Sequence, residues 1–208
     1  MRSPYVQRLI TAVAMVLTFG AAANAQTNFD NDVNAAIDAG LGWLTVNSAY
    51  VNPSSAGNAA GLAALALLEK RAGVLPSDPP QGYSGASAAD KVKLDAIMAY
   101  IITRAQASSF YAYRDGADLM ALSVYLRSGG PNQAGAIAAI NATFDRVRLN
   151  QDAEGYWCYF NNGCQDSSTT QLVMAGLASA KTVFLDPAYA DATRAGQLNT
   201  LVTKARTL

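Results

Sequence analysis

Apolar residues recur every three or four positions along most of this chain, which is the spacing of one face of an α-helix. In the segment 32–46, for example, Val33, Ile37 and Leu41 follow this spacing. The same pattern predicts helices over residues 32–46, 58–71, 88–105, 115–126, 132–149, 167–183 and 189–206. We find no segment with the strict alternation of apolar and polar residues that is typical of a strand, so we predict an all-α fold.

The predicted helices resemble one another in pairs. The first members of three successive pairs share an Ala-Ile step, which is found at Ala36-Ile37, Ala96-Ile97 and Ala139-Ile140. The second members share small residues next to leucine, in the segments 61–65, 118–122 and 173–177. Small residues at a contact let neighbouring helices approach closely. Because each pair leaves an apolar face that only the next pair can cover, we predict a curved stack of helical hairpins, with three pairs and one further helix.

The N-terminus has the composition of an export signal. Arg2 and Arg8 introduce an apolar run, and Ala23-Asn24-Ala25 supplies the small residues that signal peptidase requires. A retained membrane anchor is the alternative, but the run is short for a membrane span and ends in small residues. We therefore expect a signal peptide at residues 1–25, a repeat domain at 26–208 that is periplasmic or secreted, and no stable membrane span after cleavage.

Charge excludes one class of partner. Residues 1–25 hold two arginines and no acid, so their removal leaves 13 basic and 15 acidic residues. A domain this close to neutrality lacks the basic surface that nucleic acids and anionic lipids require. We therefore expect no nucleic-acid partner.

The cysteines, Cys158 and Cys164, lie six residues apart in one predicted loop. In an exported protein this spacing favours a local disulfide. A metal site is the alternative, but it needs further ligands and the chain contains no histidine. We predict a disulfide, and neither a metal nor another cofactor.

One segment carries a sharper motif. Residues 151–157 read Gln-Asp-Ala-Glu-Gly-Tyr-Trp and match Q-x-x-x-G-x-W through Gln151, Gly155 and Trp157. The segment 139–181 thereby resembles one repeat of the α/α-toroid superfamily, which includes squalene and hopene cyclases and protein prenyltransferase β subunits. The rest of the chain resembles the family loosely. The resemblance implies a partial α/α toroid, either an open arc or one completed by further repeats or a second copy.

The motif residues also have plain physical roles. Gly155 permits a tight turn, and the Gln151 amide can bond backbone groups at the end of a neighbouring helix. Trp157 can cover that bond with its large flat ring. Asp166 or Ser167 is suited to cap the next helix. In the family, this motif ties repeats together and takes no part in the chemistry.

The catalytic groups of the family are not matched. Cyclases that protonate their substrate use D-x-D-D, whereas this chain has Asp30-Asn31-Asp32 and the pair Asp115 and Asp118. We interpret Asp30 or Asp32 as the cap of the first helix and Asp115 as the cap of the fourth. The prenyltransferase zinc site needs histidine, and neither cysteine has the glutamine three residues on that a thioester requires. The missing histidine also excludes Ser-His-Asp and Cys-His sites.

Two groups of side chains keep other functions open. Asp152, Glu154 and Asp166 could supply the acid and base of a glycoside hydrolase, although loop acids are usually only solvated. Aromatic residues in two predicted turns could face a ligand, stacking on sugar rings or stabilising carbocations, or could simply pack in those turns. These residues are Tyr111, Tyr113, Tyr156, Trp157, Tyr159 and Phe160.

These observations favour an exported binding or structural module over an enzyme, with a protein, a lipid or a glycan as its ligand. A diverged cyclase-like enzyme with Asp115 or Asp118 as its acid is the first alternative. A carbohydrate-active α/α barrel that uses Asp152, Glu154 or Asp166 is the second.

Overall fold

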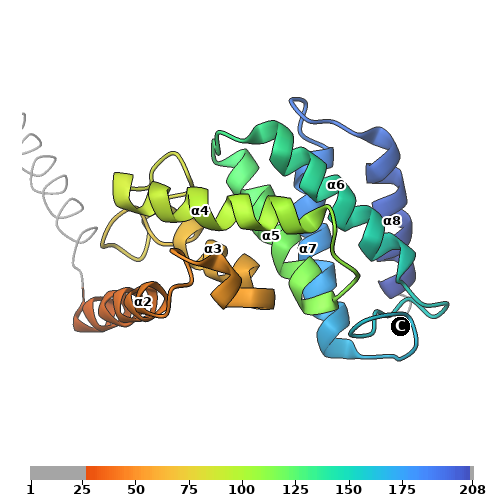
Figure 1. Cartoon of the computed structure of the whole chain (residues 1–208), viewed down its shortest axis with the longest axis horizontal. Coiled ribbons are helices and arrows are strands. Elements are labelled where there is room, and N and C mark those ends of the chain that lie inside the picture. Colours follow the sequence, from red (N-terminus) through yellow and green to blue (C-terminus); the bar gives the residue numbers. More distant parts are fainter. Residues whose placement is uncertain (1–26, 207–208) are drawn as a thin grey trace, which may run out of the picture.

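The computed structural model describes residues 27–206, and the predicted signal peptide therefore lies outside the described part (Figure 1). The elements are α2 (Asn28–Val46), the 3₁₀-helix η1 (Pro53–Ala59), α3 (Ala60–Leu68), α4 (Ala88–Ala105), α5 (Ala112–Arg127), α6 (Gln133–Leu149), α7 (Ser167–Phe184) and α8 (Ala192–Arg206). Within residues 27–206 the only β-pairing is two isolated bridges, Arg71 with Pro80 and Trp157 with Asp166. The predicted all-α class is confirmed.

The second predicted helix differs most from the structure. It was expected over 58–71, but α3 spans only Ala60–Leu68 and follows η1. Gly57, with φ of +51°, breaks the helix on the N-terminal side. On the other side the chain folds back, so that Gly82 N donates to Leu68 O at 2.9 Å and Gln81 Nε2 donates to Leu67 O at 2.7 Å. These bonds satisfy the last carbonyls of α3 and end it before the apolar pattern stops.

Three helices, α3, α5 and α7, pack side by side with α5 in the middle. Their contacts run through glycines that leave no room for a side chain. A Cβ on Gly61 would lie 2.6 Å from the carbonyl carbon of Ala117, and a Cβ on Gly116 would lie 2.5 Å from Leu172 O. A Cβ on Gly176 would lie 2.6 Å from Gly116 O. The small residues that recur in the predicted second members therefore lie where successive hairpins meet.

The first members of the pairs form the other packing contacts. Helix α4 packs against α6, and α6 packs against α5, while α8 packs on α7. Figure 1 shows α2 at one end of the molecule and α8 at the other. Successive pairs thus pack in chain order, as the hairpin prediction requires. Closure or curvature into a toroid stays a prediction.

The core is centred on α5, in which 12 of 16 residues are buried. Aromatic and aliphatic side chains from α4, α6 and α7 surround it, including Ile97, Phe144 and Leu177. Helix α2 contrasts with α5, because Leu41 is its only buried residue. The amphipathic stripe of α2 is therefore only partly covered.

The helix caps correct two predictions. Thr27 caps α2, and neither Asp30 nor Asp32 does: the Thr27 side chain accepts from Asp30 N at 3.2 Å and Asp30 Oδ2 accepts from Thr27 N at 3.0 Å, which is a capping box. Helix α5 begins at Ala112 with Tyr111 as its N-cap, so Asp115 lies inside the helix. The predicted capping of α7 by Asp166 is confirmed.

Candidate functional site

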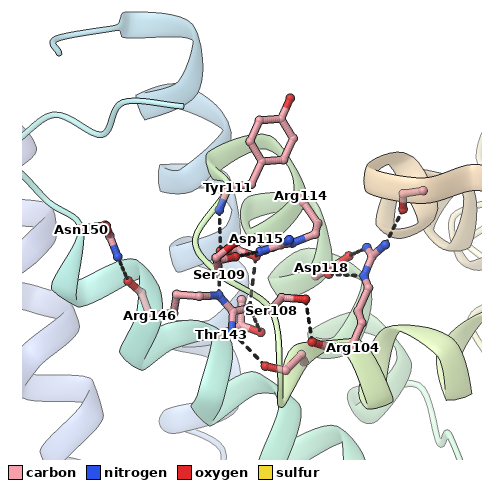
Figure 2. A network of polar contacts seen from close by, with 12 residues as sticks. Arg104, Ser108, Ser109, Tyr111, Arg114, Asp115, Asp118, Thr143, Arg146 and Asn150 are labelled. Atoms are coloured by element: carbon pink, nitrogen blue, oxygen red, sulfur yellow. Dashed lines mark hydrogen bonds and ion pairs between the residues drawn. The ribbon is translucent and has the colours of Figure 1, made fainter. Parts of the chain in front are cut away.

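Two carboxylates are buried on the central helix α5. Asp115 and Asp118 are three residues apart and so share one side of the helix. Their side chains are 0% and 1% exposed. Three arginines reach them: Arg104 from α4, Arg114 from α5 and Arg146 from α6 (Figure 2).

Asp118 forms a two-pronged ion pair with Arg104. Arg104 Nε lies 3.1 Å from Asp118 Oδ2, and Arg104 Nη2 lies 2.5 Å from Oδ1. The third nitrogen, Nη1, donates to the carbonyl of Gly57 in η1. This one arginine therefore joins α4, α5 and η1. Burial raises the pKa of Asp118 to about 6, and the opposing effect of Arg104 is smaller.

Asp115 is surrounded by donors. Arg146 donates to it through Nε at 2.9 Å and Nη2 at 3.1 Å, and Arg114 Nε donates at 2.9 Å. The backbone N–H of Tyr111 also donates, at 3.2 Å. Asp115 was expected to cap its helix; it does bond Tyr111 N, but from the fourth helical position and as the centre of an ion-pair network.

The arginines of this network also hold the connection between α4 and α5. Arg146 Nη1 donates to Ala105 O at 2.9 Å, and Arg114 Nη2 donates to the carbonyl of Ser109. Together with the Tyr111 bond, these contacts fix the segment 105–111 from both ends. Charges this deeply buried are stable only when paired. The arrangement thus ties α4, α5 and α6 together and positions Tyr111.

The Q-x-x-x-G-x-W segment joins α6 to α8. Gln151 Nε2 donates to Leu201 O of α8 at 3.0 Å. Gly155 has φ of +107°, and a Cβ there would lie 2.7 Å from Lys204 O, so only glycine fits this turn. Trp157 is fully buried, and its Nε1 donates to Val147 O in the last turn of α6 at 2.9 Å. These motif residues hold two helices together.

Two of the three loop acids, Asp152 and Asp166, have separate structural partners. Asp152 Oδ1 accepts from the backbone of Gly155 and Tyr156, each at 2.7 Å, and so closes the turn that contains Glu154, which is exposed. Asp166 accepts from Ser168 Oγ at 2.6 Å and from Thr169 N at 2.9 Å. These bonds lower the pKa of Asp166, and the bond from Ser168 has the largest effect. A general acid needs the opposite shift.

Cys158 and Cys164 form the predicted disulfide, with their Cα atoms 5.0 Å apart. The loop that it closes carries Tyr159 and Phe160. A backbone bond from Ala112 N to Tyr159 O, 2.9 Å long, attaches this loop to the start of α5. The loop is therefore fixed both within itself and to the central helix.

Four rings gather at this point, and we refer to Tyr111, Tyr113, Tyr159 and Phe160 as the aromatic cluster. The Tyr111 and Phe160 rings stack with centroids 4.9 Å apart. The Tyr113 and Tyr159 rings meet edge to face at 5.7 Å. Phe160 is 69% exposed and Tyr159 is 38% exposed, while the Tyr113 hydroxyl lies 2.6 Å from Ser168 Oγ. The cluster thus presents apolar ring surface beside hydroxyl and carboxylate groups.

The sequence placed these rings among the candidates but did not identify the arginine network. Tyr156 is also a candidate; it lies in the preceding turn, where its backbone pairs with Asp152, and its side chain is partly exposed. The available signal for the network was Asp115 and Asp118 at helical spacing inside a segment whose other residues are mainly apolar. Their arginine partners come mainly from other helices, so spacing could not identify them.

Two further findings concern the described residues as a whole. Among residues 27–206, no group of three or more histidine, cysteine or acidic side chains is placed to hold a metal ion. In the same part of the chain, no helix has the length and apolarity needed to cross a membrane.

Comparisons with protein-family models, with curated proteins and with solved structures find no match to this chain.

Proposed function

We propose that this chain is an exported, non-catalytic binding module of the α/α-toroid type, and that the aromatic cluster is its ligand-contacting surface. The observation that carries the proposal is the exposure of Phe160 and Tyr159 on a loop that a disulfide and a backbone bond to α5 hold in place. Large exposed rings on a fixed loop bind with little loss of conformational entropy.

A neutral glycan is the ligand class that suits this surface. The rings offer flat apolar faces, while the Tyr113 hydroxyl, Ser168 and Asp166 form a polar edge that can bond sugar hydroxyls. The near-neutral charge of the mature chain favours a neutral ligand over a polyanion. A hydrocarbon chain suits the cluster less well, because it leaves these polar groups without partners.

The buried carboxylates support the non-catalytic part of the proposal. Each oxygen of Asp115 and Asp118 accepts from an arginine, and the two side chains are at most 1% exposed. A cyclase-like enzyme with Asp118 as its acid is the alternative proposal, and the raised pKa of this group is its one specific support. Against it, both oxygens of Asp118 accept from Arg104, so neither is directed at a substrate.

Calorimetric titration with a panel of neutral oligosaccharides tests the proposal. Phe160→Ala should weaken binding about tenfold, because one lost ring contact of about 1.4 kcal/mol corresponds to that factor. The thermal midpoint should change little, since the side chain is mostly exposed. Leu185→Ala is the matched control: this side chain is 58% exposed but lies outside the cluster, and the variant should bind like the wild type.

Two results would contradict the proposal: no binding to any oligosaccharide of the panel, or binding that Phe160→Ala leaves unchanged.

Export is tested separately by mass spectrometry of the protein recovered outside the cytoplasm. We expect its N-terminus at Gln26, directly after the Ala23-Asn24-Ala25 sequence.

A further inference from the structure

The hairpin of α2 and α3 exposes an unusual amount of apolar surface. Trp43 is 64% exposed and Val46 is 84% exposed, and both lie on α2. We refer to the whole surface as the N-terminal face; its exposed large apolar side chains are Phe29, Ile37, Trp43, Val46, Val51, Leu62 and Val74. Exposed apolar side chains concentrated in one part of a fold are typical of an interaction site.

Hollows between α2 and α3 give this face its shape. One cavity of about 350 Å³ is lined by Trp43, Leu44 and Leu62 among others. A second cavity of about 510 Å³ is lined by Ile37, Leu41 and Leu44 among others. Leu44 borders both, so the two cavities adjoin. The N-terminal face therefore combines protruding side chains with hollows that can receive side chains.

Acidic and basic residues lie in separate parts of the N-terminal face. Helix α2 carries Asp30, Asp32 and Asp38 and no basic residue. Across the groove, the segment that follows α3 holds Lys70 and Arg71 next to Glu69, and Lys70 and Arg71 line the second cavity. Lys70 Nζ is 3.9 Å from Asp38 and 3.8 Å from Asp90, which are long, partly exposed contacts. The acidic helix of one molecule can therefore face the basic segment of another.

We infer that the N-terminal face is a two-fold contact between two copies of this chain. A head-to-tail contact would need a second apolar surface of similar extent. In residues 75–206, the exposed large apolar side chains outside the aromatic cluster are three: Val92, Leu149 and Leu185, one each on α4, on α6 and just after α7. The N-terminal face therefore has itself as its matching surface, and a self-complementary contact closes at two copies. The inference does not depend on glycan binding by the aromatic cluster.

Multi-angle light scattering after size exclusion tests this contact on protein produced from the full reading frame. The wild type should have twice the mass of the chain in the micromolar range. Trp43→Asp and Val46→Asp should have the mass of one chain, because each places a charge in the apolar contact. Val92→Asp is the matched control, since Val92 is 70% exposed on α4, and it should keep the double mass. Far-ultraviolet circular dichroism should be the same for all four proteins.

Tryptophan emission gives a second readout. The chain has two tryptophans, of which Trp157 is buried in the monomer and Trp43 is exposed. Dilution of the dimer should shift the emission to the red, and Trp43→Phe should remove the shift. An unchanged spectrum on dilution through the dissociation range would overturn the inference.

Other outcomes would also overturn the inference. A wild type of single mass throughout the micromolar range would do so, as would a mass that grows beyond two copies or a Val46→Asp variant of double mass. Sedimentation with phosphatidylglycerol vesicles tests whether the N-terminal face binds a membrane surface instead of a second copy. A wild-type monomer that binds these vesicles through Trp43 would assign the N-terminal face to a membrane surface.

Discussion

Replacing Asp115 by Asn tests the structural role of the buried carboxylates most sharply. The substitution preserves shape but removes the charge that balances Arg146 and Arg114. The Asp115 side chain is 0% exposed, and those of Arg146 and Arg114 are 13% and 10% exposed, so water cannot replace it. Breaking a buried ion pair costs about 3–5 kcal/mol. Since a domain is stabilised by about 5–15 kcal/mol, the variant should lose a large part of its stability.

Urea unfolding followed by circular dichroism measures this cost. The control is Asp145→Asn, because Asp145 pairs with Arg194 at 2.8 Å, as close as the contacts of Asp115, but their side chains are 40% and 26% exposed. An exposed pair contributes about 0–1 kcal/mol, so the control should unfold almost like the wild type. Adding Arg146→Met to Asp115→Asn should restore some stability, because it removes an unpaired buried charge. A cost for Asp115→Asn below about 1 kcal/mol would refute the reasoning.

Further predictions concern the pH dependence and the packing. Asp118 titrates near its ordinary value of 3.8 when unfolded and near 6 when folded, so the folded state binds more protons between these values. Its contribution to stability should be complete below about pH 4 and lost as the pH rises through about 6; Asp118→Asn should lack this trend in urea unfolding. Gly116→Ala should lower the thermal midpoint by several degrees, because its Cβ would lie 2.5 Å from the backbone of α7, whereas Gly196→Ala on α8 meets nothing within 4 Å and should be neutral or gain up to about 1 kcal/mol. Trp157→Ala should lower the free energy of unfolding by about 3–5 kcal/mol in urea unfolding. A change within about 1 kcal/mol would show that Trp157 does not support the packing.

Local pattern determined much of the fold. The limits of α4 were predicted to the residue, and those of α6 and α7 to within one, because apolar spacing and polar caps coincide there. The C-terminal limit of α3 was missed because Gln81 and Gly82, which lie in the loop between α3 and α4, bond its last carbonyls. Such a bond is a tertiary contact, and helix periodicity carries no information about it.

The candidate site was likewise predicted only where local sequence determines it. The spacing of Cys158 and Cys164, together with the export signal and the absence of histidine, was sufficient to predict their disulfide. Asp115 was misassigned as a cap because its role depends on Arg146, which lies 31 residues away on another helix. The exposure of Phe160 depends on how the disulfide loop lies against α5 and could not be predicted from the order of residues.

The account rests on the claim that the exposed rings bind a ligand while the buried acids hold the helices together. Nuclear magnetic resonance of ¹³C-labelled aromatic and aspartate side chains, during titration with a neutral oligosaccharide, observes both groups at once. We expect shift changes at Tyr111, Tyr159 and Phe160 and none at Asp115 or Asp118. Changes at the two buried carboxylates without changes at the rings would contradict the claim.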